Sequence, residues 1–283
     1  MKSTIIKAPA KVNLYLDVIN KRSDGYHNIE TVFERISLCD WIKVSLAAHG
    51  IKLICNKNIP IGTNNTVYKA AKLLSTRYNL KYGFKIEIDK RIPIAAGLGG
   101  GSSDAAATLL GISKLLDIKL NKKDLLEIAA KIGADVPFFA SKYNRAFATG
   151  IGEKLTPLKQ GQKWHFLIVV PRIKISTASV YSKGGFALTK KKRGVNILRS
   201  YLQLDSNNIK NTLFNKLEDI VLPLYPELGR IKKALNKTGV EGVLVSGSGS
   251  AVYAIFQDRK GVVRAEETLS KEGNWQLFLA ESY

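Results

Sequence analysis

The chain has 283 residues, of which 45% are hydrophobic and 24% are charged, so it can bury a sizeable core and extensive disorder is not expected. Its formal net charge is +21, which favours anionic partners such as nucleic acid, a membrane surface or phosphorylated metabolites. The lysines are spread over every segment rather than gathered in one stripe. The densest basic run, residues 190–193, lies between glycines and is interpreted as a solvated loop. Charge alone does not choose among these partners.

Cysteine usage and the first residues indicate the compartment. Cys39 and Cys55 are the only cysteines, and neither belongs to a C-x-x-C pair. Two thiols so placed favour a reduced, cytoplasmic protein over a disulfide scaffold. Residues 1–16 contain three lysines and lack the apolar region of a signal peptide. No apolar run approaches the length of a membrane span, so we expect no membrane partner.

Hydrophobic periodicity predicts both strands and helices in the first half of the chain. Asn121 is expected to cap the last of these helices. The predicted strands cover residues 12–16, 41–46 and 84–88, and the predicted helices cover residues 67–74, 102–116 and 122–132.

A polar stretch at residues 157–163, containing proline and glycine, predicts a boundary between a domain of residues 1–158 and one of residues 159–283. The mixed order of elements, with strands at both ends, indicates an α+β fold of two domains. In the second domain the predicted strands are residues 166–170, 243–246, 251–256 and 276–280, and the predicted helices are residues 213–221, 227–236 and 262–271.

The strongest chemical signal is a glycine-rich loop that follows a predicted strand and opens directly into an alanine-rich helix. Missing side chains let backbone N–H groups approach a polyphosphate, and the helix N-terminus adds partial positive charge. A flexible linker is the alternative, but linkers rarely join a strand to a helix so directly. The chain has no Gly-Lys dipeptide, which excludes a Walker A motif. The predicted phosphate-binding residues are Pro93, Ile94, Ala95, Ala96, Gly97, Leu98, Gly99, Gly100, Gly101, Ser102 and Ser103.

This loop resembles the phosphate loop of the GHMP kinases, the superfamily of galactokinase, homoserine kinase, mevalonate kinase and phosphomevalonate kinase. Residues 8–14 resemble its N-terminal motif and residues 245–254 its C-terminal glycine motif, so the similarity spans essentially the whole chain. The resemblance implies an α+β, two-domain GHMP kinase fold, with a ribosomal-protein-S5-like N-terminal domain and a ferredoxin-like C-terminal domain. It also implies ATP and Mg²⁺ as cofactors.

Four further segments resemble one branch of that superfamily, whose members phosphorylate the 2-hydroxyl of 4-diphosphocytidyl-2-C-methyl-D-erythritol in the non-mevalonate route to isoprenoid precursors. The implied partner is therefore a small molecule with a cytidine diphosphate group, not nucleic acid. Lys216 departs from the branch, which usually has an acid there, and we expect it to lie at a helix end away from the chemistry. The four segments are residues 11–16, 22–27, 132–139 and 150–153.

The resemblance implies catalytic roles for Asp135 and Lys11. Asp135 would accept the proton of the attacking hydroxyl, and Lys11 would pair with it, lower its pKa and stabilise charge near the phosphate. The residues alone leave simpler alternatives. An Asp just before Pro137 most often caps a turn, and an isolated lysine on a strand usually belongs to a solvated face.

The resemblance also implies that Tyr26 and His27 hold the cytosine, with Tyr181 as an opposing aromatic ring. Composition alone would make Tyr26 and His27 a surface pair, and residues 247–250 a hairpin turn. Asn65 would contact the nucleotide, although helix capping is the simpler account. The remaining predicted substrate contacts are Asn13, Thr177, Gly247, Ser248 and Gly249.

Other functions stay open. Another GHMP kinase would share the glycine loop but should lack the residue 24–27 segment. A basic RNA-binding protein would need interleaved aromatic and basic residues, and no such module is visible. A catalytically silent relative is disfavoured because Lys11 and Asp135 are both present. No carboxylate cluster in the sequence marks metal ligands; Ser102 or Ser103 could contact the ion, and the oligomeric state is not predicted.

Overall fold

The computed structural model describes residues 2–159, 162–183 and 212–283, so the basic run at residues 190–193 lies outside the described residues. The chain forms two compact units that interleave in sequence. The predicted division at residue 158 stays a prediction, because no single cut of the chain separates these units. Unit 1 comprises Met1–Ala10, Cys39–Ile94 and Gly99–Tyr143, and unit 2 comprises Lys11–Leu38, Ala95–Leu98 and Asn144–Tyr283.

Unit 1 contains a sheet with the strand order β3-β4-β2-β1. β3 pairs with β4 in parallel, and β4 pairs with β2 in antiparallel register. The division between the units falls within β1 and β2, so that only residues 3–10 and 39–47 of these strands belong to unit 1. The strands span Ser3–Lys21 (β1), His27–Ala47 (β2), Ile51–Cys55 (β3) and Gly83–Asp89 (β4).

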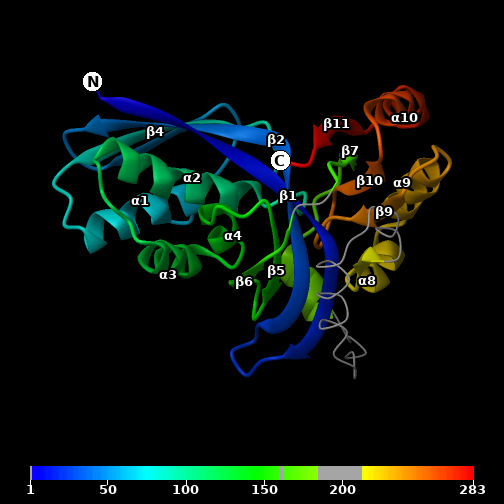
Figure 1. Cartoon of the computed structure of the whole chain (residues 1–283), viewed down its shortest axis with the longest axis horizontal. Helices are drawn as coiled ribbons and strands as arrows, with labels where there is room; N and C mark the ends of the chain where they lie inside the picture. The colour runs from blue at the N-terminus through cyan, green and yellow to red at the C-terminus, as the bar shows by residue number, and fades with distance from the viewer. Residues whose placement is uncertain (1, 160–161, 184–211) are drawn as a thin grey trace. The chain divides into compact units, whose positions relative to one another are not determined.

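Helices cover one face of this sheet (Figure 1). Asn121 accepts a 2.8 Å hydrogen bond from the N–H of Asp124, which confirms the predicted helix cap. α2 packs close to the strands at Gly111, where an added Cβ would lie 3.0 Å from Val44. The helices span Thr66–Arg77 (α1), Gly100–Leu115 (α2), Lys122–Ile132 (α3) and Val136–Ala140 (α4).

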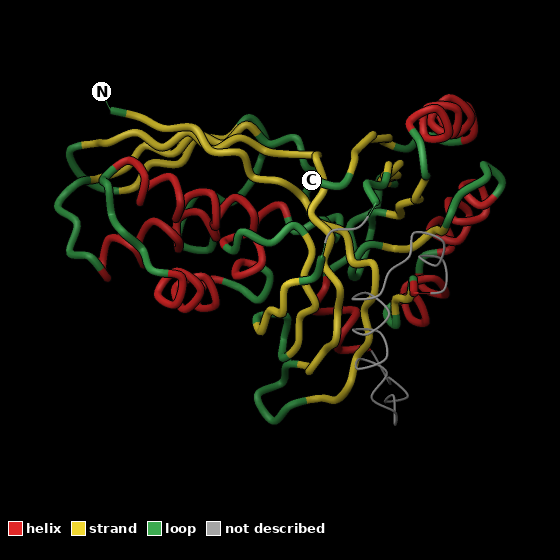
Figure 2. The backbone as a smooth tube through the Cα atoms, in the orientation of Figure 1, coloured by secondary structure: helices red, strands yellow, loops and turns green. Residues whose placement is uncertain are grey.

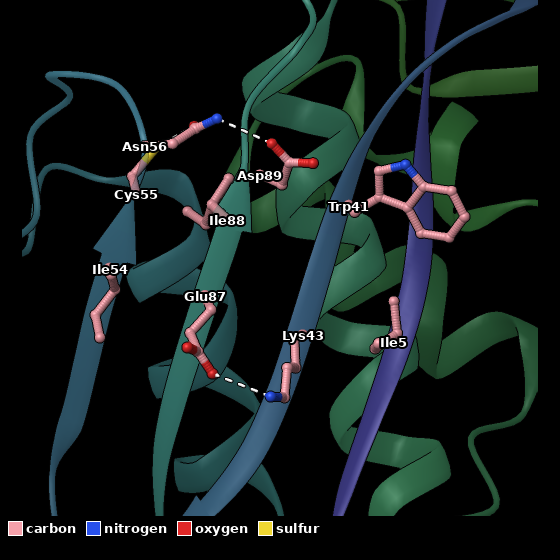
Figure 3. Close-up of a pocket in the computed structure, with 9 residues that line it drawn as sticks. All are labelled: Ile5, Trp41, Lys43, Ile54, Cys55, Asn56, Glu87, Ile88 and Asp89. Carbon is pink, nitrogen blue, oxygen red and sulfur yellow. Dashed lines mark hydrogen bonds and ion pairs between the residues drawn. The ribbon is translucent and has the colours of Figure 1, made fainter.

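The opposite face of the unit 1 sheet bears a pocket of about 440 Å³ (Figure 3). Ile5, Trp41 and Ile54 give it apolar surface, and Lys43 pairs with Glu87 across 3.7 Å. None of the predicted site residues lines this pocket, so it carries no argument for the function predicted from the sequence.

Unit 2 contains a four-stranded antiparallel sheet with the strand order β11-β7-β10-β9. In chain order the strands follow the βαββαβ pattern of a ferredoxin-like arrangement, with both α8 and α9 between β7 and β9 and with α10 between β10 and β11, which confirms the predicted fold. Figure 2 shows these elements as short yellow strands and red helices. Their bounds are His165–Val170 (β7), Glu218–Leu224 (α8), Pro226–Asn236 (α9), Gly242–Val245 (β9), Val252–Phe256 (β10), Arg259–Glu272 (α10) and Gln276–Glu281 (β11).

The rest of unit 2 is built on the second parts of β1 and β2. β5 pairs with β2, and the two-residue strand β8 pairs with β1 in parallel. The predicted helix at residues 213–221 is therefore wrong in its first half, because residues 214 and 215 extend alongside β1 and the helix begins at Glu218. The added elements are Arg145–Thr149 (β5), Lys154–Pro157 (β6), Thr177–Lys183 (α5) and Phe214–Asn215 (β8).

Two predictions from composition can be compared with the structure. Cys39 and Cys55 are not joined to each other by a disulfide. Within the described ranges, none of the helices combines the length and the apolar character that a membrane span requires.

Candidate active site

The predicted site residues fall in both units, and in unit 1 the largest group surrounds the start of α2. Gly99 is the N-cap residue, with a φ of 71°, and as a glycine it has no side chain that could cap this helix end. The first N–H groups of a helix have no intrahelical acceptor, which suits those of α2 to an anion. Ser103 donates a 2.6 Å hydrogen bond to the carbonyl of Pro9, whereas Ser102 is partly exposed. Ser102 is thus the better placed of the two hydroxyls for a ligand.

The middle of the glycine loop, residues 95–98, belongs to unit 2 and lies against the second glycine segment. Gly97 has a φ of 78°, and an added Cβ would lie 2.0 Å from the carbonyl oxygen of Ser246. The hydroxyl of Ser246 donates to the Gly97 carbonyl at 3.0 Å, and the N–H of Ala251 donates to the Ala96 carbonyl at 3.0 Å. The prediction that the two glycine segments lie near each other is confirmed for this part of the loop.

Lys11 is a buried residue of β1 with 4% of its surface exposed. Its ammonium donates to Asn13 Oδ1 at 2.6 Å and to the Gly97 carbonyl at 3.0 Å, and it lies 5.4 Å from the ring centroid of Phe33. The alternative of a solvated strand face is therefore wrong. Asn13 in turn donates to the hydroxyl of Thr31 at 2.8 Å, so its amide orientation is fixed by partners on both sides.

The second glycine loop closes onto this lysine. An added Cβ at Gly247 would lie 3.5 Å from Asn13 Oδ1 and 3.7 Å from Lys11 Nζ, so the glycine keeps the backbone close to both polar groups. The hydroxyls of Thr177 and Ser248 share a 2.8 Å hydrogen bond. Because β9 and β10 pair on either side of the loop, it is also a hairpin connection, as the simpler interpretation of this segment held.

Two residues predicted to bind the cytosine, His27 and Tyr181, have their rings close together. The rings of His27 and Tyr181 have centroids 5.2 Å apart and planes inclined by 35°. Tyr181 and Thr177 lie four residues apart on α5, so they share one helix face. Partial burial, with the charge of Lys21 nearby, lowers the pKa of His27 below its usual 6.5. His27 is then neutral at pH 7, with one ring nitrogen donating and the other accepting.

The turn before His27 is held by one carboxylate. Asp24 accepts a 2.7 Å hydrogen bond from the guanidinium of Arg22 and a 3.1 Å bond from the N–H of Tyr26. The bond from Arg22 lowers the pKa of Asp24, which keeps this acceptor ionised. Gly25, with a φ of 86°, completes the turn, and Tyr26 is 60% exposed. The turn thus presents Tyr26 and His27 at the surface of unit 2.

Asp135 lies in unit 1, at the position that precedes α4. Its side chain makes no capping hydrogen bond to that short helix, and the alternative of an Asp that caps a turn before Pro137 stays a prediction. The residue is half-buried, and the N–H of Val136 donates to the carbonyl of Gly133 at 3.2 Å to form the turn that carries it. Because Lys11 belongs to unit 2, the predicted pairing of Lys11 with Asp135 stays a prediction.

Asn65 caps the N-terminus of α1, which is the simpler of the two roles predicted for it. Its side-chain oxygen accepts from the N–H of Val67 at 2.8 Å, and its amide donates to the carbonyl of Pro60 at 2.6 Å. Helix capping of α1 is therefore confirmed. A contact between Asn65 and a nucleotide stays a prediction.

Asn215 and Glu218 support the second glycine loop and were missed from the sequence. The Asn215 amide donates 2.8 Å hydrogen bonds to the carbonyls of Val245 and Gly247, and a Glu218 oxygen accepts from the N–H of Val245 at 2.7 Å. Lys216 itself pairs with Asp219 at 2.8 Å, near the start of α8. No sequence signal joins residues 30 positions apart.

Comparisons with known proteins identify the family. Residues 65–143 match the GHMP kinases N terminal domain, and residues 186–274 match the GHMP kinases C terminal domain. The chain is 42% identical over 277 residues to "4-diphosphocytidyl-2-C-methyl-D-erythritol kinase" of Geotalea daltonii, with 97% of each chain covered. It is 42% identical to the protein of the same name in Geobacter sulfurreducens, with 95% of each chain covered.

Solved structures agree with this relationship. A crystal structure of 4-(cytidine 5'-diphospho)-2C-methyl-D-erythritol kinase matches with a TM-score of 0.81 and 33% identity, covering 99% of this chain and 100% of that one. Homoserine kinase from Cytophaga hutchinsonii matches with a TM-score of 0.78 but 18% identity, over 100% of this chain and 95% of that one, and so supports the fold alone. The chain belongs to the GHMP kinases and, within them, to the 4-diphosphocytidyl-2-C-methyl-D-erythritol kinase family.

Proposed function

We propose that this protein transfers the γ-phosphoryl group of ATP to the 2-hydroxyl of 4-diphosphocytidyl-2-C-methyl-D-erythritol, a step of the non-mevalonate route to isoprenoid precursors. The observation that carries the proposal is the buried Lys11, bonded to Gly97 of the predicted phosphate loop and to Asn13 beside the second glycine loop. A buried ammonium group that lies close to glycine backbone on two sides suits a polyphosphate ligand.

In the proposed reaction the bond from the γ-phosphorus to the ADP oxygen breaks, and a bond to the substrate's 2-oxygen forms. Asp135 accepts the proton that this hydroxyl loses. The start of α2, from Gly99 to Ser102, holds phosphate oxygens with backbone N–H groups. Lys11 stabilises negative charge that develops at the transferred group. This division of labour rests on positioning and electrostatics rather than on a covalent intermediate.

The cytidine end of the substrate is assigned to the aromatic pair of unit 2. His27 offers hydrogen bonds to the cytosine edge, and the rings of Tyr26 and Tyr181 offer faces for stacking. The hydroxyls of Thr177 and Ser248 are hydrogen-bonded to each other, and each can rotate to bond a diphosphate or an alcohol group of the substrate instead. Recognition of a nucleobase by this pair separates the proposed substrate from mevalonate and homoserine, which have no base.

Magnesium is the usual counter-ion of ATP, and the side chains near the predicted phosphate loop decide whether the protein itself could also hold it. No group of three or more His, Cys, Asp or Glu side chains able to hold a metal occurs in residues 2–159, 162–183 and 212–283. The residues therefore fit an ion that is held mainly by the ATP phosphates, with Ser102 as the candidate hydroxyl ligand from the protein. When bound, the ion neutralises charge on the phosphate oxygens.

The test is a substrate panel with the purified protein and Mg·ATP, in which coupled ADP release is recorded for 4-diphosphocytidyl-2-C-methyl-D-erythritol, mevalonate and homoserine. Turnover of the cytidylated alcohol alone supports the proposal. Turnover of mevalonate or homoserine instead would keep the superfamily and overturn the substrate assignment.

A further inference from the structure

A buried charged cluster in unit 1 plays no part in the reaction described above. Lys90 is 6% exposed, and its ammonium donates to the carboxylates of Asp40 and Asp104, the latter at 2.7 Å. Both carboxylates are almost fully buried. Burying three charges is costly unless the arrangement is well paired, so the cluster needs a purpose beyond filling space.

One side of the cluster fixes the chain where it enters the glycine loop. A single oxygen of Asp40, on β2, accepts the N–H groups of Arg91 at 2.5 Å and Ile92 at 2.7 Å. Asn56 accepts the N–H of Lys90 at 2.8 Å, and it donates to Asp89 at 2.9 Å (Figure 3). The backbone of residues 89–92 is therefore held at successive positions immediately before the loop.

The other side of the cluster reaches the helix where the chain leaves the loop. Asp104 belongs to the second turn of α2, four residues after Gly100. An added Cβ at Gly100 would lie 2.8 Å from the Lys90 ammonium, so the lysine sits directly against the first residue of the helix. One lysine thus contacts the segment before the loop and the helix after it.

The charge balance shows that the second carboxylate is not needed to neutralise the lysine. With all three groups ionised the cluster carries one excess negative charge, and Asp104 Oδ1 has no hydrogen-bond partner among the described residues. Burial and the neighbouring Asp40 raise the pKa of Asp104, against the lowering effect of Lys90, to about 7. Asp40 alone would neutralise the charge of the Lys90 ammonium, so what Asp104 adds is the link to α2.

We propose that Lys90, through Asp40 and Asp104, is a positioning residue that holds both ends of the phosphate loop in the conformation that binds ATP. We call these three residues the Lys90 clamp. The inference rests on the proposed function for its ligand, ATP, but the loop geometry that it explains is independent of the acceptor alcohol. Loss of the link to α2 should loosen residues 93–99 and weaken ATP binding while leaving the cytidine site intact.

The decisive variants change Asp104 and leave the buried Lys90–Asp40 pair neutral overall. Asp104→Leu removes the hydrogen bond to Lys90 at similar volume, whereas Asp104→Asn keeps an acceptor oxygen without the charge. A hydrogen bond to a charged group corresponds to about a tenfold change in an equilibrium constant, or more. We expect Asp104→Leu to raise KM for ATP by about tenfold with little change in KM for the cytidylated substrate, and Asp104→Asn to recover most of that loss.

Hydrogen–deuterium exchange of the peptide that spans residues 90–104 supplies a second readout, which needs no turnover. Asp104→Leu should speed its exchange. Ser113→Ala is the matched control, because Ser113 is buried on α2 nine residues beyond Asp104 and its hydroxyl donates to the carbonyl of Leu109, outside the clamp. Unchanged exchange and unchanged KM for ATP in Asp104→Leu, an equal rise of both KM values, or an equal effect of Ser113→Ala would overturn the clamp. If the wild-type protein phosphorylates no cytidylated alcohol, the proposed function fails, and the exchange rates still decide the clamp.

Discussion

The ammonium of Lys11 donates a 3.0 Å hydrogen bond to the carbonyl oxygen of Gly97, across 86 positions of sequence. The bond fixes the middle of the glycine loop against β1 within unit 2. It also fixes the ammonium, because Asn13 holds a second of its protons at 2.6 Å. With two of its hydrogen bonds fixed, the ammonium cannot rotate freely, so the direction of its third N–H bond is also set. Lys11 is thus pre-organised for a fixed negative charge.

Replacing Lys11 tests this relationship. Lys11→Met keeps the length of the side chain but removes the positive charge and all three donors. Loss of a pre-organised donor at a developing charge costs about 10²–10³ in kcat, and we expect a loss of that order in coupled ADP release. Lys7→Met, at an exposed position of the same strand, is the control and should keep wild-type turnover. Equal turnover in the two variants would remove Lys11 from the chemistry.

Gly97 should tolerate no side chain. Gly97→Ala forces a Cβ to within 2.0 Å of the Ser246 carbonyl at a φ of 78°, so the two glycine segments must move apart. We expect a loss of Tm and of turnover together. Gly229→Ala is the matched control, because nothing lies within 4 Å of its added Cβ and an interior helix position gains about 1 kcal/mol of stability from alanine. A Tm that falls as far in Gly229→Ala as in Gly97→Ala would contradict this account.

Tyr181 should contribute to binding of the cytidine group and not of ATP. Stacking of a base on an aromatic ring contributes about 1–3 kcal/mol, so Tyr181→Ala should raise KM for the cytidylated substrate by about tenfold or more, with KM for ATP unchanged. Tyr82→Ala removes a tyrosine that is 56% exposed in unit 1, and should change neither constant. A rise in KM for ATP in Tyr181→Ala would place this ring elsewhere.

The pH dependence of substrate binding should follow His27. Because partial burial and Lys21 lower its pKa below 6.5, the folded protein favours the neutral ring. The contribution of His27 to the free energy of unfolding is therefore present above pH 6.5 and is lost as the pH falls through the lowered pKa. Protonation also removes the ring's acceptor nitrogen, so KM for the cytidylated substrate should rise on the acid side.

His27→Gln gives the control for this profile, since glutamine offers a neutral donor and acceptor that do not titrate. KM measured between about pH 5 and 8 should lose its acid-side rise in this variant. A rise of the same size in His27→Gln would assign the titration to another group.

Local patterns predicted the elements whose cause is local. α3 begins after Asn121 and ends at Ile132 as expected, because a side-chain cap and a 3.6-residue spacing both lie within the segment. The helix predicted over residues 213–221 failed because Asn215 is held by β1 and by carbonyls 30 and 32 positions away. Its local spacing resembles a helix, and its tertiary partners override that preference.

The site shows the same limit. The glycine loop could be found in the sequence, because its chemistry depends on consecutive residues. The burial of Lys11 could not, since its partner Gly97 is distant in the chain. Lys90, Asp40 and Asp104 gave no sequence signal for the same reason: they come from the segment after β4, from β2 and from α2, and only folding brings their charges together.

The most direct measurement of the central claim is the position of the new phosphate on the product. C2 of the substrate carries a methyl group and no hydrogen, so a phosphomonoester at the 2-hydroxyl gives a phosphorus resonance without three-bond splitting by a proton. We predict one such unsplit ³¹P resonance for each ADP released, and its loss in Asp135→Asn. ADP release with a split phosphomonoester resonance, or with inorganic phosphate as the product, would contradict the account.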